Sequence, residues 1–294
     1  MIGSCVWLEM KVKEIHPKKQ VKFKLKNCKS KYTINTAPTD PKLPALFVFC
    51  GSRGSGKTYA CVAMCSHFEK KHYITRTFLI CPTKTSNDIY QNLKTLDEKK
   101  DVCDDSTKGH IALNNIMNEV KKDWDKYESD LLYQKVYNKY GKHQKPLPLK
   151  YAYILEKRNH ALPTKPHRPS HMLIMDDCQG TNLYGMRRTD IVNHMSIKHR
   201  HIPLTICFLV QSWMGLPRVV RLNATHFIVY KMGDKKQLKQ IYEHFGNTIE
   251  EDEFVNIYKY ATREPYGFLY IDTDPKEESM CFRKGFNEYI RLLK

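Results

Sequence analysis

Eight consecutive residues have the composition and spacing of a phosphate-binding loop, Gly-x-x-x-x-Gly-Lys-Thr. They are Gly51, Ser52, Arg53, Gly54, Ser55, Gly56, Lys57 and Thr58. An apolar run precedes them and a helical segment, 57–70, follows, so backbone amides and a helix N-terminus are both expected to face a phosphate. Lys57 is then expected to reach the β- and γ-phosphates, and Thr58 to supply a hydroxyl to Mg²⁺. The sequence therefore predicts a site for ATP and Mg²⁺.

Two carboxylates end a second apolar run. Asp176 and Asp177 come directly after Met172–Met175. Phosphoryl transfer needs negative oxygens gathered around a metal while a nucleophile is positioned in line. We expect Asp176 to hold Mg²⁺ through water and Asp177 to orient the attacking water. A solvated Asp-Asp turn would explain the pair taken alone, and the phosphate loop upstream favours the catalytic interpretation.

Further polar side chains follow a third apolar run. Gln211 comes after 204–210, at the edge of a sheet where ligands bind in open α/β folds, and could contact the γ-phosphate or its water. Arg218 and Arg221 lie three residues apart on one possible helical turn. One of them is a candidate arginine finger, a residue that acts across a subunit boundary. Arginine suits this role because its planar guanidinium group is always charged. The alternatives are that Gln211 is an ordinary loop residue and that the two arginines form salt bridges at the surface.

From Ala45 onward, short β-rich apolar runs alternate with helical stretches. This pattern is typical of a mostly parallel sheet covered by helices, an α/β fold. The predicted strands are Ala45–Cys50, Thr77–Cys81, Met172–Met175, Leu204–Val210, His226–Lys231 and Gly267–Ile271.

The chain divides into an appendage and a large domain. Residues 1–44 are predicted to form a basic β appendage, in which Val21, Phe23 and Leu25 alternate with lysines, followed by a proline-containing linker. Residues 45–294 form the nucleotide-binding domain, with an insertion at 86–170. The first part of the insertion is helical, because apolar residues recur at three- and four-residue spacing: Leu113, Ile116, Val120, Trp124, Tyr127 and Leu131. The second part, Lys142–Ser170, has five prolines and many basic residues and is expected to be an exposed loop or lid.

Charge and hydropathy limit the partners. The net charge of +18 favours a polyanion such as nucleic acid, although a composition biased toward lysine is the alternative explanation. The longest apolar stretch, 202–214, is too short and too polar to span a bilayer. The first residues lack the features of a signal peptide. We therefore expect no membrane partner and a location on the cytosolic side.

The ten cysteines form no Cys-x-x-Cys pair, and Cys50, Cys81 and Cys207 lie in apolar runs. Free buried thiols in a reducing compartment are the expected state. The thirteen histidines are scattered, and no transition-metal site is predicted.

The order and spacing of these motifs resemble the FtsK/HerA superfamily of DNA pumps. The resemblance rests on the phosphate loop, the Asp176-Asp177 strand end, the strand that leads into Gln211, and Pro217–Asn223. Within the superfamily the chain is most similar to the genome-packaging ATPases of large DNA viruses and virophages, such as the poxvirus packaging ATPase. The stretch Phe78–Thr83 fits that group too. The resemblance covers roughly residues 45 to 231.

The resemblance implies a RecA-like (ASCE) P-loop NTPase, with helices on both faces of the sheet, that hydrolyses Mg-ATP and translocates double-stranded DNA. Its task would be to package a viral genome into a capsid, in the host cytoplasm at the viral factory or in the virion. Subunits would form a homo-oligomeric ring, a hexamer or pentamer, with ATP between neighbours and capsid proteins as further partners. Arg218 or Arg221 would complete the neighbouring site. One departure is that bacterial members commonly have glutamate where this chain has Asp177.

Two other functions remain open. A nucleotide-gated assembly or binding protein would hydrolyse ATP slowly or not at all, and would not respond to DNA. A small-molecule kinase would also carry a phosphate loop with a basic lid, but the paired aspartates and Gln211 argue against it.

Overall fold

A computed structural model of the chain describes residues 30–83, 88–141, 148–185, 190–245, 249–275 and 277–290. The strand expected around Val21–Leu25 lies outside the described residues, as do the first six residues of the expected lid, 142–147. None of the described helices combines the length and the apolar character that crossing a bilayer requires.

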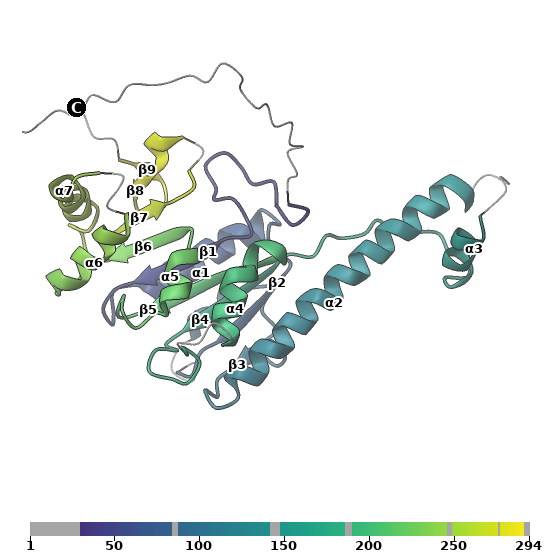
Figure 1. The fold of residues 1–294 in the computed structure, drawn as a ribbon, viewed down its shortest axis with the longest axis horizontal. Helices are drawn as coiled ribbons and strands as arrows, with labels where there is room; N and C mark the ends of the chain where they lie inside the picture. The colour runs from purple at the N-terminus through teal and green to yellow at the C-terminus, as the bar shows by residue number, and fades with distance from the viewer. Residues whose placement is uncertain are drawn as a thin grey trace, which may run out of the picture.

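The described strands form one mixed sheet in the order β3-β2-β4-β5-β1-β6-β7-β8-β9 (Figure 1). The first six strands in this order are parallel to one another, and β7, β8 and β9 continue the sheet in antiparallel fashion. The strands are β1 (Leu46–Cys50), β2 (Arg76–Ile80), β3 (Val102–Cys103), β4 (His171–Asp176), β5 (Leu204–Val210), β6 (His226–Tyr230), β7 (Phe268–Asp272), β8 (Phe282–Lys284) and β9 (Glu288–Tyr289).

The six strands predicted from the sequence are confirmed to within one residue at each end. They read as continuous apolar runs because both faces of the sheet are covered. Successive residues of β1 illustrate this: Leu46 and Val48 belong to one buried cluster, whereas Phe47 and Phe49 belong to the other. The predicted fold class, a mostly parallel α/β P-loop fold of the RecA-like kind, is confirmed. Strand β5 separates the phosphate-loop strand β1 from the acidic strand β4.

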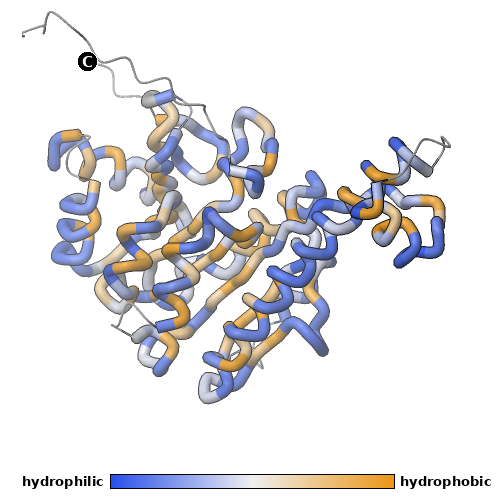
Figure 2. The backbone as a smooth tube through the Cα atoms, turned by 45° about the vertical axis from the view of Figure 1, so that its right-hand side comes forward, coloured by the Kyte–Doolittle hydropathy of each residue, from blue (hydrophilic) through white to orange (hydrophobic). Residues whose placement is uncertain are grey.

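Helices cover both faces of the sheet (Figures 1 and 2). The helix α1 (Lys57–Lys70), which has the predicted bounds, packs on one face together with residues 88–96. The other face carries apolar side chains from the remaining large helices. These are α2 (Gly109–Val136), α4 (Ile191–Lys198), α5 (Arg218–Asn223), α6 (Lys235–Phe245) and α7 (Glu251–Ala261).

The helix α2 packs on the sheet at one end and projects from the body at the other (Figure 1). Of the predicted apolar stripe, Leu113, Ile116, Val120 and Trp124 are buried. Leu131 is 40% exposed, because the helix has left the sheet at that point. The stripe is therefore buried from Leu113 to Trp124 and exposed at Leu131.

The expected lid contains a helix, α3 (Leu149–Glu156), so the prediction of a loop throughout Lys142–Ser170 is wrong there. Pro148 stands at the N-cap of α3, just before the first helical turn, where its missing N–H removes no hydrogen bond of the helix. Leu155 of α3 packs against Tyr133 and Val136 near the end of α2. The described residues 125–141 and 148–168, with α3 at the tip, form a projection that is called the arm below.

The chain segment 88–103 belongs to the body of the fold. Its short helix η2 (Asp88–Asn92) packs beneath the sheet through the buried Tyr90, and Val102 and Cys103 pair with β2 as the edge strand β3. Residues 88–103 fall within the predicted insertion 86–170 and nevertheless contribute a strand to the sheet.

Candidate nucleotide site

Four parallel strands bring their carboxyl ends to one edge of the sheet, as ligand sites in open α/β folds require. Strand β1 leads into the phosphate loop, β5 into Gln211, β4 into the two aspartates and β2 toward Thr83. A cavity of about 390 Å³ lies at this edge. It is lined by Arg53, Gly54, Lys57, Thr58, Thr83, Asp176, Asp177 and Gln211.

Two glycines are required by the shape of the phosphate loop. Gly56 has φ 95°, a left-handed conformation that side chains disfavour. Gly51 lies so close to β6 that a Cβ atom there would be 2.6 Å from the Cβ of Tyr230. The loop therefore turns tightly between strand and helix, and its amides gather at the start of α1.

Lys57 is only 8% exposed, and its ammonium group lies in the mouth of the loop. Its Nζ donates hydrogen bonds to the carbonyl oxygens of Gly51 (2.8 Å) and Ser52 (2.9 Å). Burial lowers the pKa of Lys57, and the nearby Asp176 carboxylate opposes that shift. Because an ammonium group has three N–H donors, one remains for a phosphate oxygen.

Asp176 is 7% exposed at the end of β4. Its Oδ2 accepts hydrogen bonds from the Thr58 hydroxyl (3.0 Å) and from the Tyr90 hydroxyl (2.5 Å). Burial is the main cause that raises the pKa of Asp176, and the two hydrogen bonds oppose it. The carboxylate is therefore held at a fixed position beside the phosphate loop.

The residues around Asp176 fit a hard divalent cation. Mg²⁺ prefers oxygen ligands and is usually bound in proteins by one or two such groups besides phosphate and water. The Thr58 hydroxyl and the Asp176 carboxylate, 3.0 Å apart, are donors of that kind. They would hold the ion, as the sequence predicts for both residues.

Asp177 turns away from Asp176 toward the neighbouring strand loops. Its backbone has φ 53°, a left-handed conformation that Asp tolerates better than most side chains. One carboxylate oxygen accepts a hydrogen bond from Gln211 Nε2 (2.9 Å), and the other accepts one from the Thr83 hydroxyl (3.1 Å). The structure thus brings Asp177 and Gln211 together, where they could jointly orient a water molecule.

Two residues of the site carried no recognisable sequence signal. Tyr90, which donates to Asp176, is 86 positions away from it along the chain. Gln179 shapes the turn after β5: its Oε1 accepts hydrogen bonds from the N–H groups of Gln211 (2.6 Å) and Ser212 (3.1 Å). Local spacing could not have found them, because neither residue belongs to a motif.

Arg218 and Arg221 do not line the cavity beside the phosphate loop. Arg218, at the start of α5, is exposed. Arg221 is half-buried: its guanidinium lies 5.5 Å from the ring centre of Trp213, and an N–H contacts the sulfur of Met214 at 3.3 Å. Burial is the main cause that lowers the pKa of Arg221, and the charge of Arg218 adds to it.

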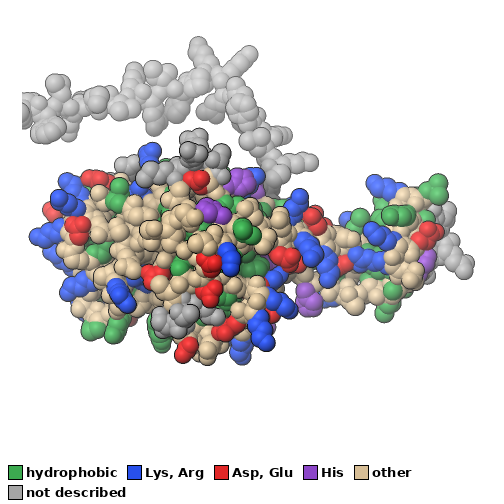
Figure 3. Space-filling view, turned by 90° about the horizontal axis from the view of Figure 1, so that it is seen from below, with side chains coloured by type: hydrophobic (Ala, Val, Ile, Leu, Met, Phe, Trp, Pro, Cys, Tyr) green, Lys and Arg blue, Asp and Glu red, His purple; other side chains and the backbone are tan. Residues whose placement is uncertain are grey.

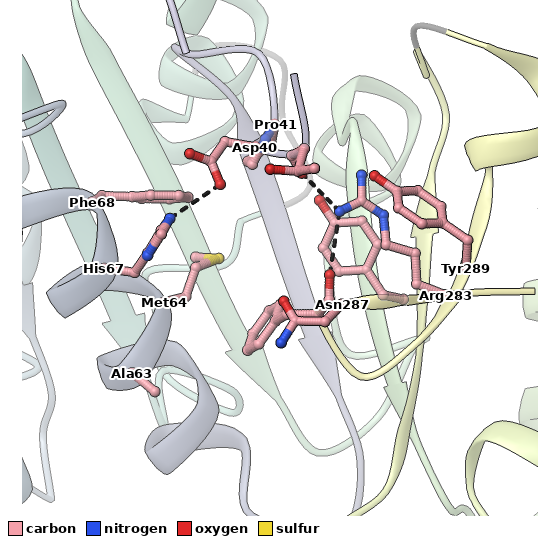
Figure 4. Close-up of a pocket in the computed structure, with 12 residues that line it drawn as sticks. Asp40, Pro41, Ala63, Met64, His67, Phe68, Arg283, Asn287 and Tyr289 are labelled. Atoms are coloured by element: carbon pink, nitrogen blue, oxygen red, sulfur yellow. Dashed lines mark hydrogen bonds and ion pairs between the residues drawn. The ribbon is translucent and has the colours of Figure 1, made fainter. Parts of the chain in front are cut away.

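A larger cavity, of about 430 Å³, lies on another side of α1 (Figure 4). His67 of α1 contacts Asp40 there at 3.0 Å, and Arg283 donates hydrogen bonds to the carbonyl oxygens of Thr39 and Phe286. No residue of the phosphate loop lines it. The bond from Arg283 to Thr39 ties the hairpin of β8 and β9 to the residues before β1. Of the two cavities, the smaller one is lined by the phosphate loop.

Three buried thiols gather beneath α1. The sulfur atoms of Cys61, Cys65 and Cys207 lie within 4.8 Å of one another, and Cys65 also contacts the sulfur of Met172. The thiols are fully enclosed in the apolar core between α1 and the sheet. The absence of a transition-metal site stays a prediction.

Fold and loop geometry together define a P-loop α/β protein of the RecA-like class. No protein-family model matches the sequence, and no curated protein matches it. Among solved structures the chain is similar to the DNA-packaging ATPase B204 of Sulfolobus turreted icosahedral virus, with a TM-score of 0.48 and 16% identity over 78% of this chain and 93% of that chain.

Two further structures are similar. The genome-packaging NTPase B204 of Sulfolobus turreted icosahedral virus 2, in complex with ATP-gammaS, has a TM-score of 0.46 and 14% identity over 80% of this chain and 94% of that chain. The conjugation coupling protein TcpA of pCW3 has a TM-score of 0.41 and 12% identity over 68% of this chain and 53% of that chain. The similar structures include viral packaging ATPases, the kind of protein that the sequence motifs resemble. At these identities the likeness is one of fold.

We predict that Asp176→Asn raises the free energy of unfolding at neutral pH. Burial raises the pKa of Asp176, so ionisation of this carboxyl opposes folding at a pH above its folded pKa, and the penalty vanishes as the pH falls toward the unfolded value of 3.8. Asparagine keeps an acceptor oxygen for Thr58 and Tyr90 without the charge. Denaturant unfolding at a series of pH values from about 7.5 down to about 4 should show a gain that shrinks once the pH falls below the folded pKa of Asp176.

The same change at Asp125, an exposed carboxylate of α2, is the control and should leave stability nearly unchanged over this range. A variant with asparagine at position 176 that is less stable than the parent protein at neutral pH would show that folding favours the ionised carboxylate.

Proposed function

We propose that the chain is a motor that hydrolyses Mg-ATP and translocates double-stranded DNA, and that it packages a viral genome into a capsid. The observation that carries the ATPase part is the meeting of the Thr58 hydroxyl and the Asp176 carboxylate, at 3.0 Å, beside the buried ammonium of Lys57. Two oxygen ligands for a metal ion and the ammonium group of Lys57 thus lie beside the backbone amides of the phosphate loop. The arrangement suits a magnesium-bound triphosphate.

Each residue has a role that follows from its position. The loop amides and Lys57 bind and orient the phosphates, and Thr58 and Asp176 would hold Mg²⁺. When bound, this ion neutralises charge on the phosphate oxygens. Asp177 and Gln211, joined at 2.9 Å, position the attacking water and accept its hydrogen atoms in hydrogen bonds. Hydrolysis transfers the γ-phosphoryl group to that water and releases ADP and phosphate.

Lys57→Ala is expected to lower ATP turnover by about 100-fold or more, because it removes the cation that faces the transferring phosphoryl group. Phosphate release is the measurement, with and without duplex DNA. The parent protein should turn over faster when duplex DNA is present. Turnover that depends on Lys57 but does not respond to DNA would reject the motor and favour a nucleotide-gated assembly protein.

Arg218 is the stronger candidate for a role in a neighbouring subunit of the proposed ring, whether pentamer or hexamer. A trans-acting arginine must reach across a subunit boundary, and Arg218 is exposed at the start of α5. Arg221 instead lies against Trp213 and Met214 of its own chain. We therefore assign the trans role to Arg218 and an intrasubunit packing role to Arg221.

Mixing two inactive variants tests this assignment. Arg218→Ala subunits and Lys57→Ala subunits should each be inactive alone, and a mixture should recover part of the ATPase activity, because some interfaces then combine an intact Lys57 with an intact Arg218. Arg221→Ala serves as the matched control and should give no recovery in the same mixture. Recovery with Arg221→Ala and none with Arg218→Ala would reverse the assignment.

The DNA part of the proposal is supported by the distribution of charge. The stretch from Leu131 to Arg168 holds nine lysines and arginines and a single acid, Glu156. Its described residues, 131–141 and 148–168, form the outer part of the arm, and Figure 3 shows Lys and Arg side chains on the surface there. The arm is therefore more basic than the chain as a whole, whose excess is +18 over 294 residues. A projecting basic surface suits contact with a phosphate backbone.

Replacing Lys135, Lys139 and Lys150 of the arm with glutamate should weaken binding to duplex DNA. Each phosphate contact contributes about 0.9 to the slope of log affinity against log salt, so the slope should fall by up to about 3. The matched control replaces Lys235, Lys236 and Lys239, three exposed lysines of α6. Equal losses in both variants would mean that net charge alone, rather than the arm, attracts DNA.

The ring would act with capsid proteins, in the host cytoplasm at the viral factory or in the virion. Residues 45–294 would form the motor domain, and residues 1–44 a basic appendage to it.

A further inference from the structure

An exposed tyrosine from the C-terminal third of the chain lies against the phosphate loop. Tyr266 precedes β7, and a Cβ atom built on Gly56 would be 3.3 Å from its Cδ1 atom. The side chain is nonetheless 72% exposed. Packing on Gly56 therefore uses only a small part of the ring, and most of its surface faces solvent next to the proposed phosphate site.

The backbone of Tyr266 has an unfavourable conformation. Its φ is 61°, which is rare for a bulky residue. The next residue, Gly267, donates its N–H to the carbonyl of Glu264 at 3.0 Å, and a Cβ at this glycine would be 2.8 Å from the carbonyl oxygen of Ala261. Strained conformations of this kind persist where the surrounding structure fixes them, and they cluster at ligand sites.

The sheet order fixes the direction in which a bound nucleotide would run. The residues expected around the γ-phosphate, Asp176 and Gln211, end β4 and β5, on one side of the phosphate-loop strand β1. The nucleoside must then leave on the other side, over β6 and β7. Phe268 of β7 pairs with Tyr230 at the carboxyl end of β6, so Tyr266 stands at this edge, about two strand spacings (roughly 10 Å) from β1.

We propose that the ring of Tyr266 is the platform on which the nucleobase of the bound nucleoside triphosphate stacks. The proposal rests on the proposed binding of the triphosphate at the phosphate loop and adds the site for the base. Every nucleobase has a π-face that can stack on an aromatic ring, so we expect Tyr266 to support the binding of ATP and GTP equally. It contributes affinity for the nucleoside and none for the phosphates.

Tyr59, in the first turn of α1, is as exposed as Tyr266 and is the natural competitor for this role. Lys57 and Tyr59 are two residues apart on one helix, which rotates their side chains by about 200° from each other. Because Lys57 faces the phosphates, Tyr59 leaves the helix on a different side. The geometry therefore favours Tyr266.

The test compares the binding of Mg-ATP, Mg-GTP and inorganic tripolyphosphate by calorimetry. Tyr266→Ala should weaken ATP and GTP binding by roughly 5- to 150-fold, the usual range for loss of one stacked base, and should leave tripolyphosphate affinity unchanged. Tyr266→Phe, which keeps the ring, should retain the affinity of the parent protein. In turnover assays Tyr266→Ala should raise KM and leave kcat nearly unchanged.

Two control variants separate stacking from a disturbed loop. Tyr260→Ala removes a half-exposed ring from α7, one turn before the same loop, and should leave all three affinities unchanged. Equal losses for ATP and tripolyphosphate in Tyr266→Ala would mean that the ring only supports the phosphate loop, and would overturn the platform. A nucleoside-specific loss in Tyr59→Ala instead of Tyr266→Ala would also overturn it. If the parent protein bound none of the three compounds, the proposed function itself would fail, and the platform with it.

Discussion

The carboxylate of Asp176 must be stabilised at the end of a strand that is buried on both faces, and this requirement organises the site. Removing a carboxylate from water costs several kcal/mol unless hydrogen-bond donors and opposite charge replace the lost hydration. Here the compensation comes from separate elements: the Thr58 hydroxyl from α1, the Tyr90 hydroxyl from η2, and the nearby charge of Lys57. The charge is tolerable only when β1, β4 and the segment after β2 occupy their places in the sheet.

A chain of hydrogen bonds joins the loops that follow three strands. Gln179, after β4, binds the backbone at Gln211 and Ser212, after β5. Gln211 in turn donates to Asp177, which also accepts from Thr83, after β2. Trp213, two positions beyond Gln211, packs beneath Arg221 of α5. A displacement of any one of these loops therefore alters the partners of the others, and the edge of the sheet responds as a unit.

The sequence predicted the local parts of this arrangement well. Each strand was recognisable because it is a continuous apolar run, and the approach of Thr58 to Asp176 could be expected because both follow the carboxyl ends of parallel strands. The order of the sheet was unreadable, because strand pairing leaves no local pattern. Tyr90 was missed because it belongs to no motif, whereas Thr58 and Asp176, 118 positions apart, each belong to one. The helix α3 was missed for a different reason. Prolines suggested a loop, but Pro148 stands where a helix can begin.

The arm has a mechanical consequence. An α-helix rises about 1.5 Å per residue, so Val136 near the tip of α2 lies about 35 Å from Leu113 at its anchored end. Leu113 packs in the same buried cluster as Phe78 of β2. This strand leads toward Thr83, which lines the cavity beside the phosphate loop. A tilt of about 10° at that anchor would carry the tip through about 6 Å. The length of the helix therefore means that any change of angle at its base would be amplified into a much larger displacement of its tip.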